Sequence, residues 1–209
     1  MDVQIKPVLR SNCGFEDARE VQLIGLPEMR DAILNSILQH PLNRGVLVGD
    51  SELTIMLKVA VGGKDYCDKV PWASIAFDSY LTSGLPIVLD FHLIKYLGDD
   101  RDYPFGIPSP NVFMARGINW TVLRSTLLHE FSHLLDALNP EFGYSVTLKK
   151  SLTGQESHRL QGLWNDSINR RLAGLLGSDY TIRPSEESSS DLSGYTYPEL
   201  VRIVNSRTE

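Results

Sequence analysis

The sequence predicts an α+β fold in a single domain spanning residues 1–209, on three observations. The chain is 42% hydrophobic and 22% charged, which suits one globular unit with a sizeable core. Segments rich in β-branched residues, separated by turn residues, recur between residues 45 and 116. Two long segments with apolar residues at helical spacing follow them. We therefore expect a small mixed or antiparallel sheet, built from 45–116, to pack on a helical lobe over 119–206, with residues 1–20 loosely ordered.

A helix and a hairpin are expected first along the chain. Residues 26–39 have an apolar stripe at helical spacing, and His40 precedes a proline that ends the helix. His40 is therefore expected at a helix end rather than on a metal. Residues 45–62 predict a β-hairpin, with strands over 46–48 and 53–61 joined by a Gly-Asp-Ser-Glu turn.

Three further strands and one long loop lead to the helical lobe. The strands are expected over residues 72–79, 86–91 and 111–116. The loop over 98–110 is rich in Gly, Pro and Asp and is long enough to form a lid or a substrate wall. The helices that follow are expected over 119–138 and about 156–176.

Charge and hydropathy exclude several classes of partner. The net charge is −6 and no Lys/Arg run is present, so we expect neither nucleic acid nor an anionic membrane as a partner. No apolar run reaches the roughly 18 residues of a transmembrane helix, and the N-terminus lacks the apolar core of a secretory signal. We expect synthesis in the cytosol, with delivery by a non-classical route left open. The oligomeric state is left open as well.

The helix over 119–138 contains the motif His129-Glu130-x-x-His133. Residues four apart lie on one face of a helix, so both imidazoles can point at one ion. Zn²⁺ accepts neutral imidazole nitrogens, and a catalytic zinc keeps one position open for water. Glu130 lies about 100° round the helix, where its carboxylate can take a proton from that water. The motif predicts a catalytic zinc site with Glu130 as general base.

The surroundings of the motif favour a metal site over two histidines packed in a core. Seven apolar residues of the helix are spread round most of its surface, so the helix is expected to be buried. Buried polar side chains cost several kcal/mol unless they are paired or bind a metal. Asp136 shares the face of the histidines and is expected behind the ligands or paired with a core polar group. Asn119 or Thr121 is the expected N-cap.

A catalytic zinc of this kind needs a third protein ligand. The extended motif with a third histidine would need Gly at 136, where the chain has Asp136. The pattern Glu187-x-x-x-Asp191 places two carboxylates on one helical face instead. Glu187 is the expected ligand and Asp191 the expected acceptor for the second N–H of His129. Glu186 is an alternative ligand, and a solvated acidic loop over 184–191 is the alternative without a metal.

The two motifs together resemble the gluzincin metallopeptidases, and most closely the catalytic domain of anthrax lethal factor and its bacterial relatives. The shared features are the His-Glu-Phe-x-His-x-x-Asp sequence, a later Glu, and a tyrosine, Tyr180, seven residues before Glu187. The resemblance covers residues 129–191. It implies a zincin-like fold with the motif on a buried helix, and Tyr180 as the hydrogen-bond donor to the oxyanion. Three tyrosines are alternative donors: Tyr144, Tyr195 and Tyr197.

The resemblance implies a zinc-dependent endopeptidase that cleaves a specific protein substrate, with a delivered effector or toxin as one possible setting. The substrate would bind in extended form along an exposed edge strand just upstream of the helix. That strand is expected to comprise Asn111, Val112, Phe113, Met114, Ala115 and Arg116. One alternative is a zincin-like metal-binding regulatory module without turnover. Another keeps the metal site and hydrolyses a non-peptide amide or cell-wall peptide.

Overall fold

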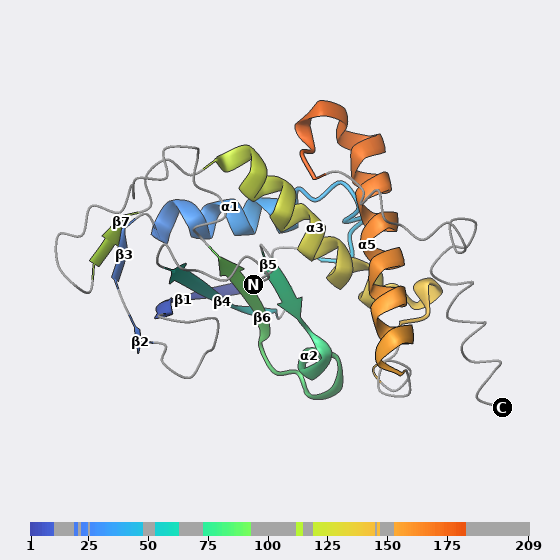
Figure 1. The fold of residues 1–209 in the computed structure, drawn as a ribbon, viewed down its shortest axis with the longest axis horizontal. Helices are drawn as coiled ribbons and strands as arrows, with labels where there is room; N and C mark the ends of the chain where they lie inside the picture. The colour runs from blue at the N-terminus through green and yellow to red at the C-terminus, as the bar shows by residue number, and fades with distance from the viewer. Residues whose placement is uncertain are drawn as a thin grey trace.

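The structure, a computed structural model shown in Figure 1, describes residues 1–10, 19–20, 22–24, 26–47, 53–62, 73–92, 112–114, 119–144, 146 and 153–182. In chain order the elements are β1 (Asp2–Arg10), β2 (Arg19–Glu20), β3 (Gln22–Ile24), α1 (Leu26–Leu38), β4 (Thr54–Gly62), β5 (Ala73–Ala76), α2 (Asp78–Ser83), β6 (Ile87–His92), β7 (Val112–Met114), α3 (Trp120–Leu138), the 3-10 turn η2 (Pro140–Phe142), α5 (Gly154–Leu176) and the 3-10 turn η3 (Gly177–Asp179).

The main sheet has five strands in the order β2-β1-β4-β6-β5. The three central strands, β1, β4 and β6, are parallel, whereas β2 and β5 are antiparallel to their neighbours at the two edges. A separate pair of parallel strands, β3 and β7, forms a second small sheet. The fold is therefore α+β with a small mixed sheet, as the sequence predicted.

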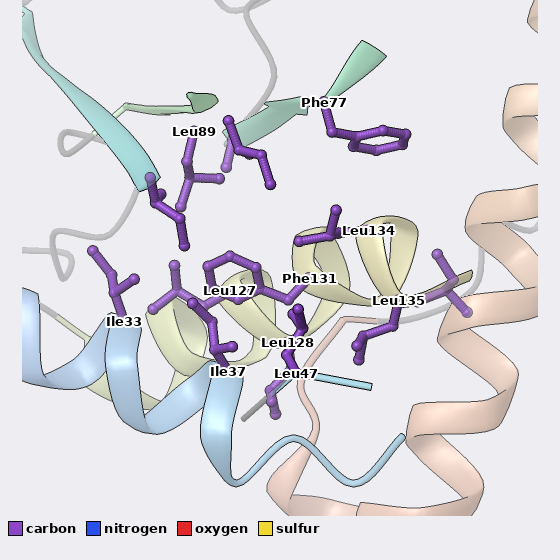
Figure 2. Close-up of a cluster of buried hydrophobic side chains, with 14 of the residues drawn as sticks. Ile33, Ile37, Leu47, Phe77, Leu89, Leu127, Leu128, Phe131, Leu134 and Leu135 are labelled. Atoms are coloured by element: carbon purple, nitrogen blue, oxygen red, sulfur yellow. The ribbon is translucent and has the colours of Figure 1, made fainter. Parts of the chain in front are cut away.

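The core lies between the main sheet and the helices. Along β4, Ile55 and Leu57 are buried, whereas Thr54, Met56 and Lys58 are half-buried, which is the alternation expected when one face of a sheet is covered. Figure 2 shows Leu127 and Phe131 of α3 lying between α1 and Leu89 of the sheet. On its other flank α3 packs against α5 (Figure 1). This position, between the sheet and α5, makes α3 the most enclosed of the described helices.

Three predicted helices are confirmed, because their signals are local. α1 covers most of the predicted range 26–39. α3 begins after Asn119, whose side-chain oxygen accepts a hydrogen bond from the Val122 N–H at 3.2 Å. α5 begins at a capping box, in which the Thr153 side chain and the Glu156 carboxylate each accept from the other's backbone N–H.

The predicted hairpin over 45–62 is wrong. Residues 45–47 do not form a strand, and β4 pairs in parallel with β1 and β6. The nearly continuous apolar run of β4 is typical of a strand with parallel neighbours on both sides, and the turn residues before it suggested a hairpin incorrectly.

The expectation that residues 1–20 are loosely ordered is also wrong for residues 2–10. They form β1, which pairs with β4 over its whole length, from Asp2 opposite Thr54 to Arg10 opposite Gly62. The sequence carried a signal for the start of this strand, since Val3 and Ile5 alternate with the polar residues Asp2, Gln4 and Lys6.

The predicted strand over 72–79 is shorter than expected, because β5 ends at Ala76 and α2 begins at Asp78. Asp78 supplies a negative charge in the first turn of α2, and Gly84 ends it with a φ of 65°, a conformation that favours glycine. The strand predicted over 86–91 is confirmed as β6. None of the described helices combines the length and apolarity needed to cross a bilayer.

Candidate metal centre

The motif residues lie in the middle of α3, where the helix is enclosed on both flanks. His129, Glu130 and His133 are each less than 10% exposed. The two imidazole rings meet edge to face with their centroids 5.0 Å apart, as the four-residue spacing predicted. Their pairing on one face of α3 is the geometry that two ligands of a single ion require.

The ring of His129 is held from behind by α5 and by the segment that follows it. Its Nδ1 lies 2.8 Å from the side-chain oxygen of Asn169 and 3.3 Å from the hydroxyl of Tyr180. The Tyr180 hydroxyl also donates to the same Asn169 oxygen at 2.6 Å. Burial lowers the pKa of His129 below its ordinary 6.5, so the neutral ring is favoured. A neutral ring that donates from Nδ1 leaves Nε2 as its electron-pair donor.

His133 has a different environment. Its ring lies against the indole of Trp164, with centroids 4.5 Å apart, and its Nδ1 is buried with no hydrogen-bond partner among the described residues. Burial, and secondarily the neighbouring His129, lower the pKa of His133 well below 6.5. Asn165 lies beside both rings, with its oxygen 3.4 Å from Nε2 of His129. Buried polar atoms are rarely left unpaired, so this orphaned imidazole nitrogen is an observation that fits a missing ligand.

Glu130 is directed toward β5, on the sheet side of α3. Its carboxylate accepts a hydrogen bond from the backbone N–H of Ile75, which lowers the pKa, but burial outweighs this and raises the pKa from 4.5 to about 7. β5 is the last strand in the order of the main sheet, and it packs against α3. A buried carboxylate is thus placed between the imidazole pair and a sheet edge.

Asp136 is paired with a core polar group, which is one of the two roles expected for it. Its carboxylate accepts two hydrogen bonds from the guanidinium of Arg171, at 2.8 and 2.5 Å, and one from the indole N–H of Trp164 at 2.8 Å. All of these partners lie on α5. With its oxygens engaged in this way, Asp136 is not a candidate metal ligand.

His40 and Tyr144 are placed away from the imidazole pair. His40 lies behind α3, where Nε2 donates to the Leu128 carbonyl at 2.8 Å and Nδ1 accepts from the Leu42 N–H. This agrees with its expected place at a helix end. Tyr144, an alternative oxyanion donor, donates its hydroxyl to Asp78 at 2.5 Å.

Tyr180 is brought to the site, but on a different side of His129 from the one expected. It is buried, and burial together with the charge of Glu130 raises the pKa of its hydroxyl above the ordinary 10. The hydroxyl lies at Nδ1 of His129, whereas an oxyanion donor would be needed on the Nε2 side. In this state Tyr180 therefore supports the histidine, and the oxyanion role stays a prediction.

Several predicted site residues lie outside the described part of the chain. These are Glu186, Glu187, Asp191, Tyr195, Tyr197, Asn111, Ala115 and Arg116. Val112–Met114 form β7, which pairs with β3 in the second sheet. Within the described ranges no three His, Cys, Asp or Glu side chains gather to hold a metal. The third ligand predicted at Glu187 stays a prediction.

Two asparagines and one strand were not anticipated from the sequence. Asn165 and Asn169 lie one turn apart on α5, beside the apolar stripe of that helix. Their spacing and their position at the edge of a buried stripe were the available signals. β5 is the strand that the structure places against Glu130.

Comparison of the chain with protein-family models, with curated proteins and with solved structures finds no match in any of the three. Arguments about function therefore rest on the geometry of the centre and on the motif.

Proposed function

We propose that the protein is a zinc-dependent peptidase with a zincin-like fold. The observation that carries the proposal is a buried pair of imidazoles, with ring centroids 5.0 Å apart on one helix, next to the buried side chain of Glu130. A core packed only for stability has little use for this group, because burying three polar side chains costs several kcal/mol unless a ligand compensates.

The residues fit a zinc ion. His129 has its Nδ1 hydrogen-bonded at 2.8 Å, which leaves Nε2, 3.4 Å from the Asn165 oxygen, as its metal-binding nitrogen. His133 has an orphaned ring nitrogen among the described residues. We propose Glu187 as the third ligand, with Glu186 as the alternative. Bound there, zinc would supply the Lewis acidity that makes water nucleophilic near neutral pH.

The remaining chemistry belongs to side chains of the chain. Glu130 would accept the proton of the attacking water and return it to the leaving amine. It is held in place by the Ile75 N–H, and its enclosure excludes competing water. The same residue argues against a regulatory metal module, since a structural site needs no buried base beside it.

An extended protein substrate is the class that the adjacent sheet edge would suit. β5 is antiparallel to β6, and within the described sheet it has a neighbour on one side only. An extended peptide can add to such an edge through main-chain hydrogen bonds. Because β5 packs on α3, a peptide on that edge would lie close to Glu130. The strand over 111–116 remains the alternative binding edge.

The test combines metal content with cleavage of a diverse peptide library. We expect one zinc per chain in the wild type and in Glu130→Gln, and cleavage by the wild type alone, with a loss of at least about 100-fold in the variant. His133→Ala should lose the zinc. His158→Ala, which changes an exposed histidine of α5, is the control and should keep both properties.

Each other outcome assigns the site differently. Zinc retained with no cleavage of any peptide or protein would favour the regulatory module. Zinc retained by Glu187→Ala would move the third ligand to Glu186 or elsewhere. A wild type that binds no zinc would refute the proposal as a whole.

A further inference from the structure

Asn165 and Asn169 flank the ring of His129 from the same helix. They lie one turn apart on α5, with Asn165 at Nε2 and Asn169 at Nδ1. Asn169 is 5% exposed, and its side-chain oxygen is within hydrogen-bond distance of two separate groups. This makes Asn169 the shared partner of a metal-ligand candidate and of Tyr180.

The hydrogen-bond directions follow from the donor inventory of the three side chains. A carboxamide oxygen has two acceptor positions and no proton. The Tyr180 hydroxyl donates to it at 2.6 Å, and the Nδ1 of His129 lies 2.8 Å away. An oxygen facing Nδ1 requires a proton on Nδ1. The Asn165 oxygen lies farther from the other ring nitrogen, 3.4 Å from Nε2, so the shorter contact at Nδ1 selects the neutral tautomer with Nδ1–H.

We propose that Asn169 is the positioning residue that fixes the tautomer and orientation of His129 for metal binding. This rests on the proposed zinc site and gives Asn169 the task that the sequence assigned to Asp191. Tyr180 would act with it, since its hydroxyl occupies the second acceptor position of the same oxygen and restrains the amide from turning over.

A neutral amide in this place has a consequence for charge. A carboxylate behind His129 would add a second buried negative charge to a site that already contains Glu130. An amide orients the ring without that cost, because it accepts the Nδ1–H while remaining uncharged. With an amide at position 169, the site carries the buried carboxylate of Glu130 without a second one behind His129.

The experiment measures the tautomer and the zinc affinity separately. Histidine ¹⁵N shifts of the metal-free chain report which ring nitrogen carries the proton, and competition with a chelator reports binding of zinc alone. In the wild type, His129 should be protonated at Nδ1. Asn169→Ala should lose this fixed tautomer and bind zinc about 10–100-fold more weakly.

Two variants complete the test. Asn165→Ala changes the same residue type one turn away and should keep the Nδ1–H tautomer of His129. Asn169→Asp retains an oxygen acceptor, so it should keep the Nδ1–H tautomer and bind zinc no more weakly than the wild type, whereas its added buried charge should lower the stability of the metal-free fold. This variant tests the proposal independently of whether the alanine variant folds.

The proposal is overturned if the wild type or Asn169→Asp carries the proton on Nε2, or if Asn169→Ala changes neither tautomer nor affinity. A wild type with the expected tautomer but no zinc binding would refute the peptidase and the metal-positioning role together. Zinc binding that is indifferent to Asn169 would refute the positioning role alone.

Discussion

Two groups of buried polar side chains lie one turn apart on α3, and they differ in how completely they are paired. In the first, Asp136 accepts three hydrogen bonds from Arg171 and Trp164. In the second, one ring nitrogen of His133 has no partner among the described residues, and burial raises the pKa of Glu130. Among the described residues, the polar atoms of the Asp136 group are paired, whereas one ring nitrogen of the histidine group is not.

The difference in pairing indicates which buried polar residues serve binding or catalysis and which serve the fold. A fully paired group such as Asp136 and Arg171 contributes to joining α3 to α5 and needs nothing from solution. A partly paired group is costly to the fold, and such sites persist where they serve binding or catalysis. The following predictions test this contrast.

Removing the carboxylate of the paired group should have the largest effect on the metal-free protein. Asp136→Ala leaves Arg171 and the Trp164 indole without their partner, and we expect it to lower the free energy of unfolding by about 3 kcal/mol. The guanidinium side chain is 35% exposed, so water offsets part of the loss. Urea denaturation measures the change. Asp179→Ala, at an exposed position, should change little, and an equally small effect of Asp136→Ala would contradict the assignment.

Zinc should stabilise through the second group only. At a free concentration 100 times its dissociation constant, zinc should raise the free energy of unfolding by about 2.7 kcal/mol. His129→Ala should abolish this gain, whereas Asp136→Ala should retain it on a lower baseline. Thermal denaturation with and without zinc makes the comparison. If the zinc-induced stabilisation disappears in Asp136→Ala but persists in His129→Ala, the metal binds at Asp136 and the assignment to the histidine pair is wrong.

Glu130 should destabilise the metal-free fold at alkaline pH. Its pKa is raised from 4.5 to about 7, so the folded state holds the proton more tightly, and stability is lost as pH rises through that interval. At pH 8, Glu130→Gln should therefore be more stable than the wild type by up to about 3 kcal/mol. The advantage should disappear near pH 4.5. Denaturation across this range tests it, with the exposed Glu141→Gln as control; a Gln variant less stable at pH 8 would refute it.

His40 should give the smallest and oppositely directed dependence. Burial lowers its pKa below 6.5, so the unfolded state binds protons first and the wild type loses stability as pH falls below 6.5. His40→Ala should cost about 1 kcal/mol at pH 8, through its lost hydrogen bonds to Leu128 and Leu42. The cost should shrink toward pH 5. His158→Ala, at an exposed site, should show no such trend, and a cost that grows in acid would be inconsistent with a buried neutral ring.

The sequence predicted what depends on local spacing. The helices α1, α3 and α5 follow from apolar residues at a period near 3.6, and the pairing of His129 with His133 follows from their four-residue separation. The parallel pairing of β1 with β4 did not follow, because it joins segments about fifty residues apart and leaves no turn signal.

The partners of the histidines were beyond local reasoning for a related cause. Which face of α5 meets α3 is decided by packing, so the positions of Asn165 and Asn169 opposite His129 cannot be read from either helix alone. Similarly, nothing near Ile75 in the chain indicates that its N–H meets Glu130.

The enclosure of α3 between the sheet and α5 has a consequence for the timing of motion. Amide protons of a helix covered on both flanks exchange with solvent only when much of the molecule opens, so those of the middle of α3 should be among the slowest to exchange. The paired imidazoles then keep their relative placement for as long as the chain stays folded. Under the proposed function, a movement that admits a peptide would come from the surrounding segments, and β5, at the edge of the described sheet, is the described element best placed to provide it.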